Sequence, residues 1–259
     1  MHYREIQPPS TLSSVVRFFW TLEYDGALGK PVKYKLLAEG FPGLIFFFNS
    51  QYGAINGQTT EHKEFSILGK FKMMGVYLHP YALSLLFNLP AKELIHQQVT
   101  LDTLGGEAFK ELQERLFEAP TDEQRISVMI SFLHDKLKRA TSTHGRFQAC
   151  VQYVISQGGN VGLDTLSQLA GISSRQLERR FKEEAGFSPK LFSRLVRFQA
   201  SLRLATANTL STMTDIGYAA GYFDQSHFIR EFKEFSGISP KQYFRLSKQN
   251  VADNFIQLP

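Results

Sequence analysis

Residues 170–192 read AGISSRQLERRFKEEAGFSPKLF, and residues 220–244 read AGYFDQSHFIREFKEFSGISPKQYF. The second stretch repeats the first. The Ala-Gly pairs align at an offset of 50, and one extra residue in the second copy then makes the offset 51. The identical positions include Arg179 and Arg230, Phe181 and Phe232, Lys182 and Lys233, Gly186 and Gly237, and Ser188–Lys190 and Ser239–Lys241. A repeat of this kind predicts one small structural unit used twice.

Each copy has the pattern of a helix-turn-helix motif. In the first copy, Asp164 is predicted to cap a short helix over Thr165–Ala170, and Gly171 supplies the backbone freedom for a tight turn. Ser173 or Ser174 then caps a second amphipathic helix. The second copy repeats this order with a helix over Thr214–Ala220, a turn at Gly221 and a helix from Asp224 or Gln225. Such a second helix is the element that enters the major groove of DNA.

The segment between the copies is predicted to be one long helix. Pro189 suits the first position of a helix, and apolar residues follow at helical spacing as far as Ala207. A helix of this extent is roughly 28 Å long. Successive major-groove faces on one side of B-DNA lie about 34 Å apart. The rod therefore has a length suited to presenting both second helices to adjacent groove segments.

These residues closely resemble the AraC/XylS family of bacterial transcription activators. The resemblance covers residues 144–248 and is most specific in the second motif. The residues that carry it are Asp215–Tyr222 (DIGYAAGY), Asp224–Phe228 (DQSHF), Phe232-Lys233, and the Gly-x-Ser-Pro elements Gly186–Pro189 and Gly237–Pro240. The resemblance implies seven helices, binding to double-stranded DNA, and activation through contact with RNA polymerase.

Carried over by position, the resemblance also implies which side chains contact DNA. The expected base-reading residues are Ser174, Arg175, Glu178 and Arg179 in the first motif, and Gln225, Ser226, Ile229 and Arg230 in the second. Their chemistry allows this, because Arg reads guanine, Gln reads adenine, and an apolar side chain can contact the thymine methyl group. The expected phosphate contacts, which give affinity rather than sequence choice, are Lys182, Lys190, Lys233 and Lys241.

Charge is distributed unevenly along the 259 residues. Lys and Arg balance Asp and Glu over residues 1–143, whereas they exceed them by six over residues 144–248. A basic half favours a polyanion such as DNA as its partner. The single cysteine, Cys150, fits a reducing compartment, and the sequence has neither a signal-peptide pattern nor an apolar run of membrane-spanning length. We therefore expect a cytoplasmic protein that does not enter a membrane.

The N-terminal half has a different pattern, that of an α+β fold. Short β-branched or aromatic segments at 15–24, 32–38, 43–49, 51–56, 65–69 and 72–78 predict a small sheet or partial barrel. Helices are expected over 81–88, over 104–118 with Asp102 or Thr103 as cap, and from Thr121 onward. The expected organisation is a sensor-like domain at 1–100, a helical pair at 101–143, a DNA-binding domain at 144–248 and a tail at 249–259.

This order of elements is similar to the non-cupin sensor domains of some AraC-type regulators, which implies a small-molecule effector, dimerisation or both. The features carrying the likeness are Phe41-Pro42-Gly43 entering an apolar strand and Gly75–Pro80 leading into a helix. Candidate effector-pocket residues are Tyr34, Phe46, Phe48, Tyr77 and His79. Apolar positions for a homodimer face are Leu116, Phe117, Ile130 and Leu133, although packing within the helical pair explains them equally well.

Enzyme motifs such as HExxH, G-x-S-x-G, a complete P-loop and G-x-G-x-x-G are absent from the sequence, so we expect no catalytic residue, metal or cofactor. An alkylation-repair regulator would need a zinc-held cysteine cluster, which Cys150 alone cannot supply. Two alternatives stay open. One is a ligand-independent regulator whose first half serves dimerisation or partner docking. The other is a protein-binding scaffold whose weak DNA binding would depend only slightly on salt.

Overall fold

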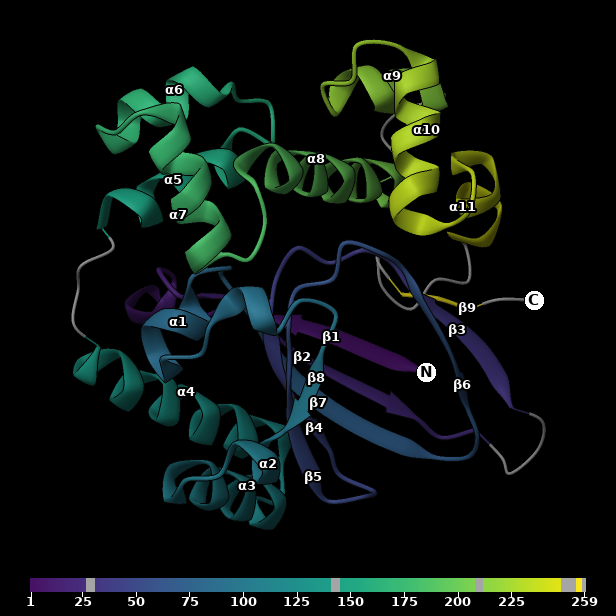
Figure 1. Ribbon diagram of the computed structural model, residues 1–259. Helices are drawn as coiled ribbons and strands as arrows, with labels where there is room; N and C mark the ends of the chain where they lie inside the picture. Colours follow the sequence, from purple (N-terminus) through teal and green to yellow (C-terminus); the bar gives the residue numbers. More distant parts are fainter. Residues whose placement is uncertain (27–30, 141–144, 208–211, 248–254, 258–259) are drawn as a thin grey trace.

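The computed structural model describes residues 1–26, 31–140, 145–207, 212–247 and 255–257. Strands dominate the N-terminal half, and helices make up the C-terminal half (Figure 1). The strands are β1 (His2–Ile6), β2 (Val16–Tyr24), β3 (Val32–Leu36), β4 (Gly43–Phe47), β5 (Tyr52–Asn56), β6 (Lys63–Ile67), β7 (Phe71–Leu78), β8 (Gln98–Thr100) and β9 (Phe255–Gln257). The α-helices are α1 (Ala82–Phe87), α2 (Leu101–Leu104), α3 (Glu107–Glu118), α4 (Asp122–Arg139), α5 (Gly145–Ser156), α6 (Leu163–Ala170), α7 (Ser174–Glu184), α8 (Pro189–Thr206), α9 (Met213–Ala219), α10 (Gln225–Ser236) and α11 (Pro240–Ser247). The predicted fold class, an α+β part followed by an all-α part with two helix-turn-helix motifs, is confirmed.

Antiparallel pairing builds two sheets. Six strands form one sheet in the order β1-β2-β7-β4-β5-β8, and β6, β3 and β9 form a smaller one. Successive residues of a strand point to opposite faces. Phe19 and Leu44 therefore face the main core together with Val76, which pairs with both. Their neighbours Trp20 and Ile45 belong to a separate apolar cluster on the other face, toward the smaller sheet.

Helices α3 and α4 cover the core face of the large sheet (Figure 1). Leu116 and Leu133, two of the residues considered for a dimer face, are fully buried there. Phe117 packs against Phe46 with ring centroids 6.4 Å apart, and Ile130 is half-buried against the same core. These four side chains thus contribute to the core of the chain. A homodimer stays a prediction, and these residues do not identify the surface through which it would form.

Several local expectations differ from the structure. The helix expected over 104–118 begins only at Glu107, as α3, because Gly105 and Gly106 have positive φ angles of 69° and 92° and separate it from the short α2. The cap position of α3 is Gly106 rather than Asp102 or Thr103, which lie within α2 behind its own cap, Thr100. Asp164 lies inside the first turn of α6, whose cap position is Gly162. Strands β1, β8 and β9 were not predicted; β9, from the expected tail, pairs with β3. The boundary expected at 143/144 lies outside the described residues.

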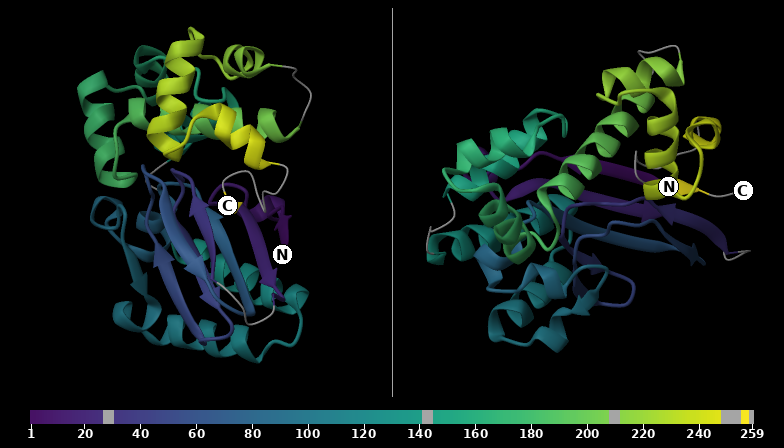
Figure 2. Two further views of the ribbon diagram at one scale, coloured as in Figure 1. Left: turned by 90° about the vertical axis from the view of Figure 1, so that its right-hand side faces the viewer. Right: turned by 45° about the horizontal axis from the view of Figure 1, so that its top comes forward.

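The two halves of the chain pack directly against each other (Figure 2) and share one continuous hydrophobic core. The backbone of Ala38 is held from both sides, because its N–H donates to Phe235 O at 3.1 Å and its carbonyl accepts from Gln199 Nε2 at 2.7 Å. The rings of Phe41 and Phe192 meet edge to face, with centroids 5.9 Å apart. Residues 38–41 therefore link the strand-rich half to α8 and α10.

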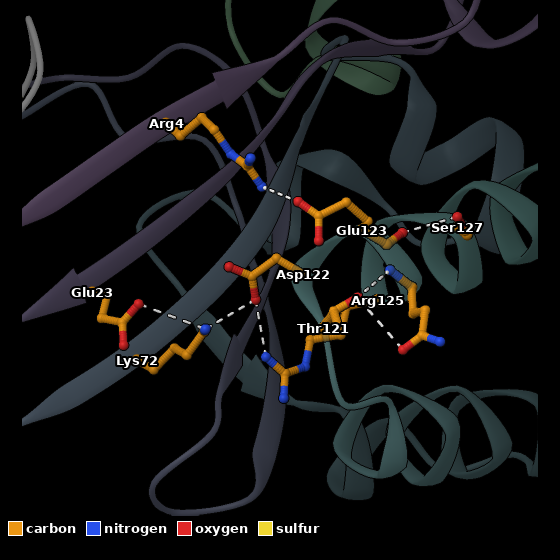
Figure 3. A network of polar contacts seen from close by, with 9 residues as sticks. Arg4, Glu23, Lys72, Thr121, Asp122, Glu123, Arg125 and Ser127 are labelled. Atoms are coloured by element: carbon orange, nitrogen blue, oxygen red, sulfur yellow. Dashed lines mark hydrogen bonds and ion pairs between the residues drawn. The ribbon is translucent and has the colours of Figure 1, made fainter.

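A network of charged groups joins the start of α4 to the large sheet (Figure 3). Asp122 Oδ1 lies 3.0 Å from Lys72 Nζ on β7 and 2.9 Å from Arg125 Nη1. Lys72 Nζ also lies 3.6 Å from Glu23 Oε2 on β2. Burial by itself would raise the pKa of the Asp122 carboxyl, but the hydrogen bonds and charges of Lys72 and Arg125 outweigh it and hold that pKa below its ordinary value.

Replacing Asp122 by Asn is expected to lower the free energy of unfolding by about 1–2 kcal/mol at pH 7, between the values typical of surface ion pairs and of buried charged hydrogen bonds. A carboxyl with a lowered folded-state pKa stabilises the fold above its unfolded pKa, and this contribution is lost as the pH falls through the folded pKa. In urea unfolding, the difference from wild type should stay constant above about pH 5 and shrink below about pH 4.

Asp135→Asn is the matched control, because it removes an exposed 3.8 Å pair with Lys138 on the same helix. It should change stability by less than about 0.5 kcal/mol. A difference for Asp122→Asn that does not vary with pH would contradict the assigned ionic role.

Candidate nucleic-acid interface

The first helix-turn-helix consists of α6 and α7, joined at Gly171. This glycine has a φ of 67°, a left-handed backbone conformation that glycine adopts without the steric cost that other residues have. Ser173 caps α7 through a reciprocal pair of hydrogen bonds. Ser173 Oγ accepts from the N–H of Gln176 at 3.3 Å, and Gln176 Oε1 accepts from the N–H of Ser173 at 3.0 Å. Leu177 and Phe181 are fully buried, so the opposite side of α7 faces outward.

The second helix-turn-helix consists of α9 and α10, joined at Gly221, which has a φ of 88°. Asp224 Oδ1 accepts a 2.7 Å hydrogen bond from the N–H of His227 and so caps α10. Phe228 and Phe232 are fully buried at the same two positions as Leu177 and Phe181 in the first motif. The sequence repeat is therefore a structural repeat.

Helix α8 joins the motifs as one uninterrupted rod. Ser188 Oγ accepts from the N–H of Leu191 at 3.2 Å, and Pro189 occupies the first position of the helix. Its 18 residues give a length of about 27 Å. The residues fully buried along it include Phe192, Leu195, Phe198 and Leu202. Because its apolar side is packed along its whole length, α8 fixes the separation of the two motifs.

Seven of the eight predicted base-reading side chains are exposed, and they gather on the outer faces of the second helices. Arg175, Glu178 and Arg179 lie on α7, and Gln225, Ser226, Ile229 and Arg230 lie on α10. Ser174 differs from the other seven because it is half-buried, with its Oγ 3.1 Å from Ser167 Oγ. Lys182, Lys190, Lys233 and Lys241, the predicted phosphate contacts, are also exposed.

A groove of about 590 Å³ runs between α7 and α10 over α8. Glu178 and Arg230 border it from the two recognition helices, and Arg194 and Arg197 lie on its floor. Sequence analysis missed these two arginines because they lie on the connecting helix rather than in either motif. Phe223, in the turn before α10, is 86% exposed, and sequence analysis did not single out this exposed aromatic side chain either.

The five predicted effector-pocket residues do not gather around one cavity. Phe46 is fully buried, and Phe48 packs against Phe117 with ring centroids 5.7 Å apart. Tyr34 is buried against Phe65. His79 lies buried with Nε2 3.2 Å from Ser13 O, and its burial lowers its pKa to about 4. Tyr77 differs from these four, because it lines a cavity.

That cavity lies between the two sheets and is called the inter-sheet chamber here. It has a main compartment of about 350 Å³ and an adjoining one of about 100 Å³. The residues that line both compartments are Leu36 and Phe65 from the small sheet, Ile45, Met73 and Tyr77 from the large sheet, and Asn56 from β5. Sequence periodicity placed these side chains on strands but could not show which strand faces enclose a space.

Among the residues that the structure describes, no three His, Cys, Asp or Glu side chains lie close enough to hold a metal ion. The helices within the same described ranges include none long and apolar enough to cross a bilayer.

Comparison with known proteins agrees with the two-part organisation. A family model described as a helix-turn-helix domain matches residues 166–246, and one described as a domain of unknown function (DUF6597) matches residues 4–100. The HTH-type transcriptional regulator MtrA of Neisseria gonorrhoeae is 32% identical over 81 residues, which are 31% of this chain and 27% of MtrA. The XylDLEGF operon transcriptional activator of Pseudomonas putida is 28% identical over 132 residues, which are 49% of this chain and 41% of that protein. The chain thus spans less than half the length of either relative.

Solved structures also align with the chain. ToxT from Vibrio cholerae O395 covers 94% of this chain and 96% of its own, with 12% identity and a TM-score of 0.46. A probable AraC family transcriptional regulator from Rhodopseudomonas palustris covers 39% of this chain and 95% of its own, with 25% identity and a TM-score of 0.36.

The C-terminal part of the chain is therefore a DNA-binding domain with two helix-turn-helix motifs. Residues 166–246 match a helix-turn-helix domain, which agrees with the AraC-type resemblance of the sequence. The proteins that it matches are transcription regulators rather than enzymes.

Proposed function

We propose that this chain is a transcription regulator that binds a bipartite site on double-stranded DNA, with α7 and α10 in adjacent major-groove segments. The observation that carries the proposal is the pair of exposed recognition faces at the two ends of one packed helix, α8. The separation set by a rod of about 27 Å is compatible with the spacing of about 34 Å between successive groove faces, since each recognition helix adds its own width.

Arg179 is the best candidate for base readout within this interface. It is exposed near the middle of the outer face of α7, and its partner Glu183 lies 3.9 Å away at the surface, so the guanidinium is easily released. Arg reads guanine through two parallel hydrogen bonds. Lys182 lies further along the same helix, where an ammonium group suits a phosphate.

We also propose that the inter-sheet chamber is the effector site. The volume of its main compartment lies within the roughly 300–1,000 Å³ range of small-molecule sites. Aliphatic and aromatic side chains line most of the chamber, and Asn56, Thr59, Gln97 and Gln98 add uncharged polar groups to the main compartment. The charged groups at its edge already have partners, because Glu39 pairs with Arg17 at 3.3 Å and Lys63 donates to His96 O at 3.1 Å. An uncharged, largely apolar molecule that also carries hydrogen-bonding groups therefore suits it best.

A route from the chamber to the DNA-binding domain supports this effector role. Glu39 and Phe41 line the main compartment. Ala38, between them and β3, is hydrogen-bonded to Gln199 of α8 and Phe235 of α10. A ligand that moves residues 38–41 would therefore act directly on the rod that positions both recognition helices.

Activation of transcription through contact with RNA polymerase is the favoured outcome, because the matched Pseudomonas putida relative is named a transcriptional activator. Run-off transcription with purified polymerase tests this, and we expect more transcript when the protein is added to a template carrying its site. Less transcript would make the chain a repressor.

Selection of binding sites from random duplex DNA at physiological salt tests the DNA-binding proposal. We expect wild type to enrich a bipartite site of roughly 17–20 bp. Arg179→Ala should relax sequence choice in one half only, at a cost of about 1–3 kcal/mol, because it removes a base contact. Lys182→Ala, the matched contrast one turn away, should weaken all sequences similarly and reduce the salt slope by about one.

Equal weakening of all sequences by Arg179→Ala would assign that residue to the DNA backbone. Failure of wild type to enrich any site, with and without added effector candidates, would refute the proposed function and favour the protein scaffold.

Binding of N-phenyl-1-naphthylamine, an uncharged apolar dye that fluoresces in apolar surroundings, tests the effector site. We expect saturable binding to wild type and its loss in Met73→Trp, because Met73 lines both compartments and the larger ring fills them. Leu68→Trp is the matched control, since Leu68 is 61% exposed and a Trp there should leave binding unchanged. Circular dichroism must show that Met73→Trp is folded. Dye binding that persists in this folded variant would favour the ligand-independent regulator.

A further inference from the structure

The turn between α5 and α6 contacts the second motif directly. Asn160, in this turn, donates a 3.1 Å hydrogen bond from Nδ2 to the carbonyl of Ala220, which is 60 residues away in the sequence and begins the turn of the second motif. Gly221 lies so close that a Cβ there would be 2.1 Å from Asn160 Oδ1. The turn that leads into the first motif is thus connected to the turn of the second motif, in addition to the connection through α8.

The Asn160 turn is itself anchored on α8. Arg197 Nη2 donates to the carbonyl of Gly159 at 3.3 Å, and its guanidinium lies 5.4 Å from the ring centroid of Tyr222 in the second motif. Gly159 has a φ of 81° and approaches α8 so closely that a Cβ would lie 2.1 Å from Ser193 O. The turn therefore has little freedom to move away from its contact with the second motif.

The second motif is also fixed to the same side of α8. Arg194 Nε donates to Glu231 Oε2 at 2.7 Å, and Arg194 Nη2 donates to Glu234 Oε2 at 2.5 Å, both on α10. Glu231 is 3% exposed, so its charge needs this partner. Arg194 thus joins α10 to the rod, and Asn160 joins the turn before α6 to the turn of the second motif.

Rotation matters because DNA is helical. A rod fixes the distance between two recognition helices, but a motif that pivots about the rod changes the angle between them. With about 10.5 bp per turn, an added base pair rotates the second half-site by about 34° around the duplex. A protein whose motifs cannot pivot accepts one spacing between half-sites, whereas a pivoting one accepts several.

We propose that Asn160 is a positioning residue that holds the second motif at one angle to the first and so sets the half-site spacing that the protein accepts. This inference rests on the proposed binding to a bipartite DNA site. Asn160 itself is exposed, and its replacement leaves the core intact. It lies outside both recognition helices, so the role is distinct from base readout.

The test uses the full chain and the site that it selects. Affinities are measured by fluorescence anisotropy for the selected duplex and for duplexes with one base pair inserted or removed between the half-sites. Wild type should lose about tenfold or more when the spacing changes, as for a mismatch in a specific site. Asn160→Ala should lose less than about threefold, because one hydrogen bond accounts for a factor of roughly 2–10. Ser156→Ala, which removes a bond to Tyr153 O within α5, should behave as wild type.

Asn160→Asp is a second variant that keeps the size of the side chain but places an acceptor against the Ala220 carbonyl. It should lose spacing discrimination as Asn160→Ala does. It replaces the alanine variant in the test if circular dichroism shows that Asn160→Ala is not folded. Retention of the full spacing penalty by a folded variant would overturn the inference.

Uniform weakening at all spacings, with a salt slope lower by about one, would also overturn the inference, because it would make Asn160 a phosphate contact. If wild type selects no bipartite site, the proposed function fails and the inference falls with it. A wild type that selects one site, together with variants that keep its spacing, would refute the inference alone.

Discussion

The buried side of α8 is the constraint on which the rest of the molecule depends. Phe192 packs against Phe181 of the first motif, and Phe198 packs against Phe232 of the second, with ring centroids 6.2 Å and 5.2 Å apart. On the N-terminal side, the same helix receives Phe41 against Phe192. Helix α8 therefore packs against the first motif, the second motif and the strand-rich half. Since side chains in a core accept few alternative arrangements, fixing α8 fixes the separation of the recognition helices and the place of the strand-rich half.

This arrangement separates two tasks while keeping them physically connected. The recognition faces of α7 and α10 are exposed, whereas α8 makes buried contacts with residues 38–41. Those residues form an edge of the inter-sheet chamber and are hydrogen-bonded to the DNA-binding domain. Because a packed interface shifts between discrete arrangements rather than deforming gradually, a small displacement there can be transmitted to both motifs. The proposed sensing and reading of DNA thus depend on the same rod.

The sequence predicted most of the features that depend on local signals. The repeat, the glycines at the turns and the Ser173 cap indicated both motifs and the long helix, because each feature acts within a few residues of itself. It could not show which strand faces enclose a cavity, and so it named Phe46 and His79, which are buried and do not line the inter-sheet chamber, and did not name Met73, which lines it. Strand β9 and Asn160 were also missed. Their partners are distant in the sequence, and a hydrogen bond to a remote backbone carbonyl leaves no periodic pattern.

The central claim is that two motifs at a fixed separation bind one face of a duplex. Hydroxyl-radical footprinting of the wild-type complex on its selected site tests this most directly. We expect two protected patches on one face of the duplex, centred about one helical turn, or 10–10.5 bp, apart. A single protected patch, or protection spread evenly along the duplex, would contradict the account.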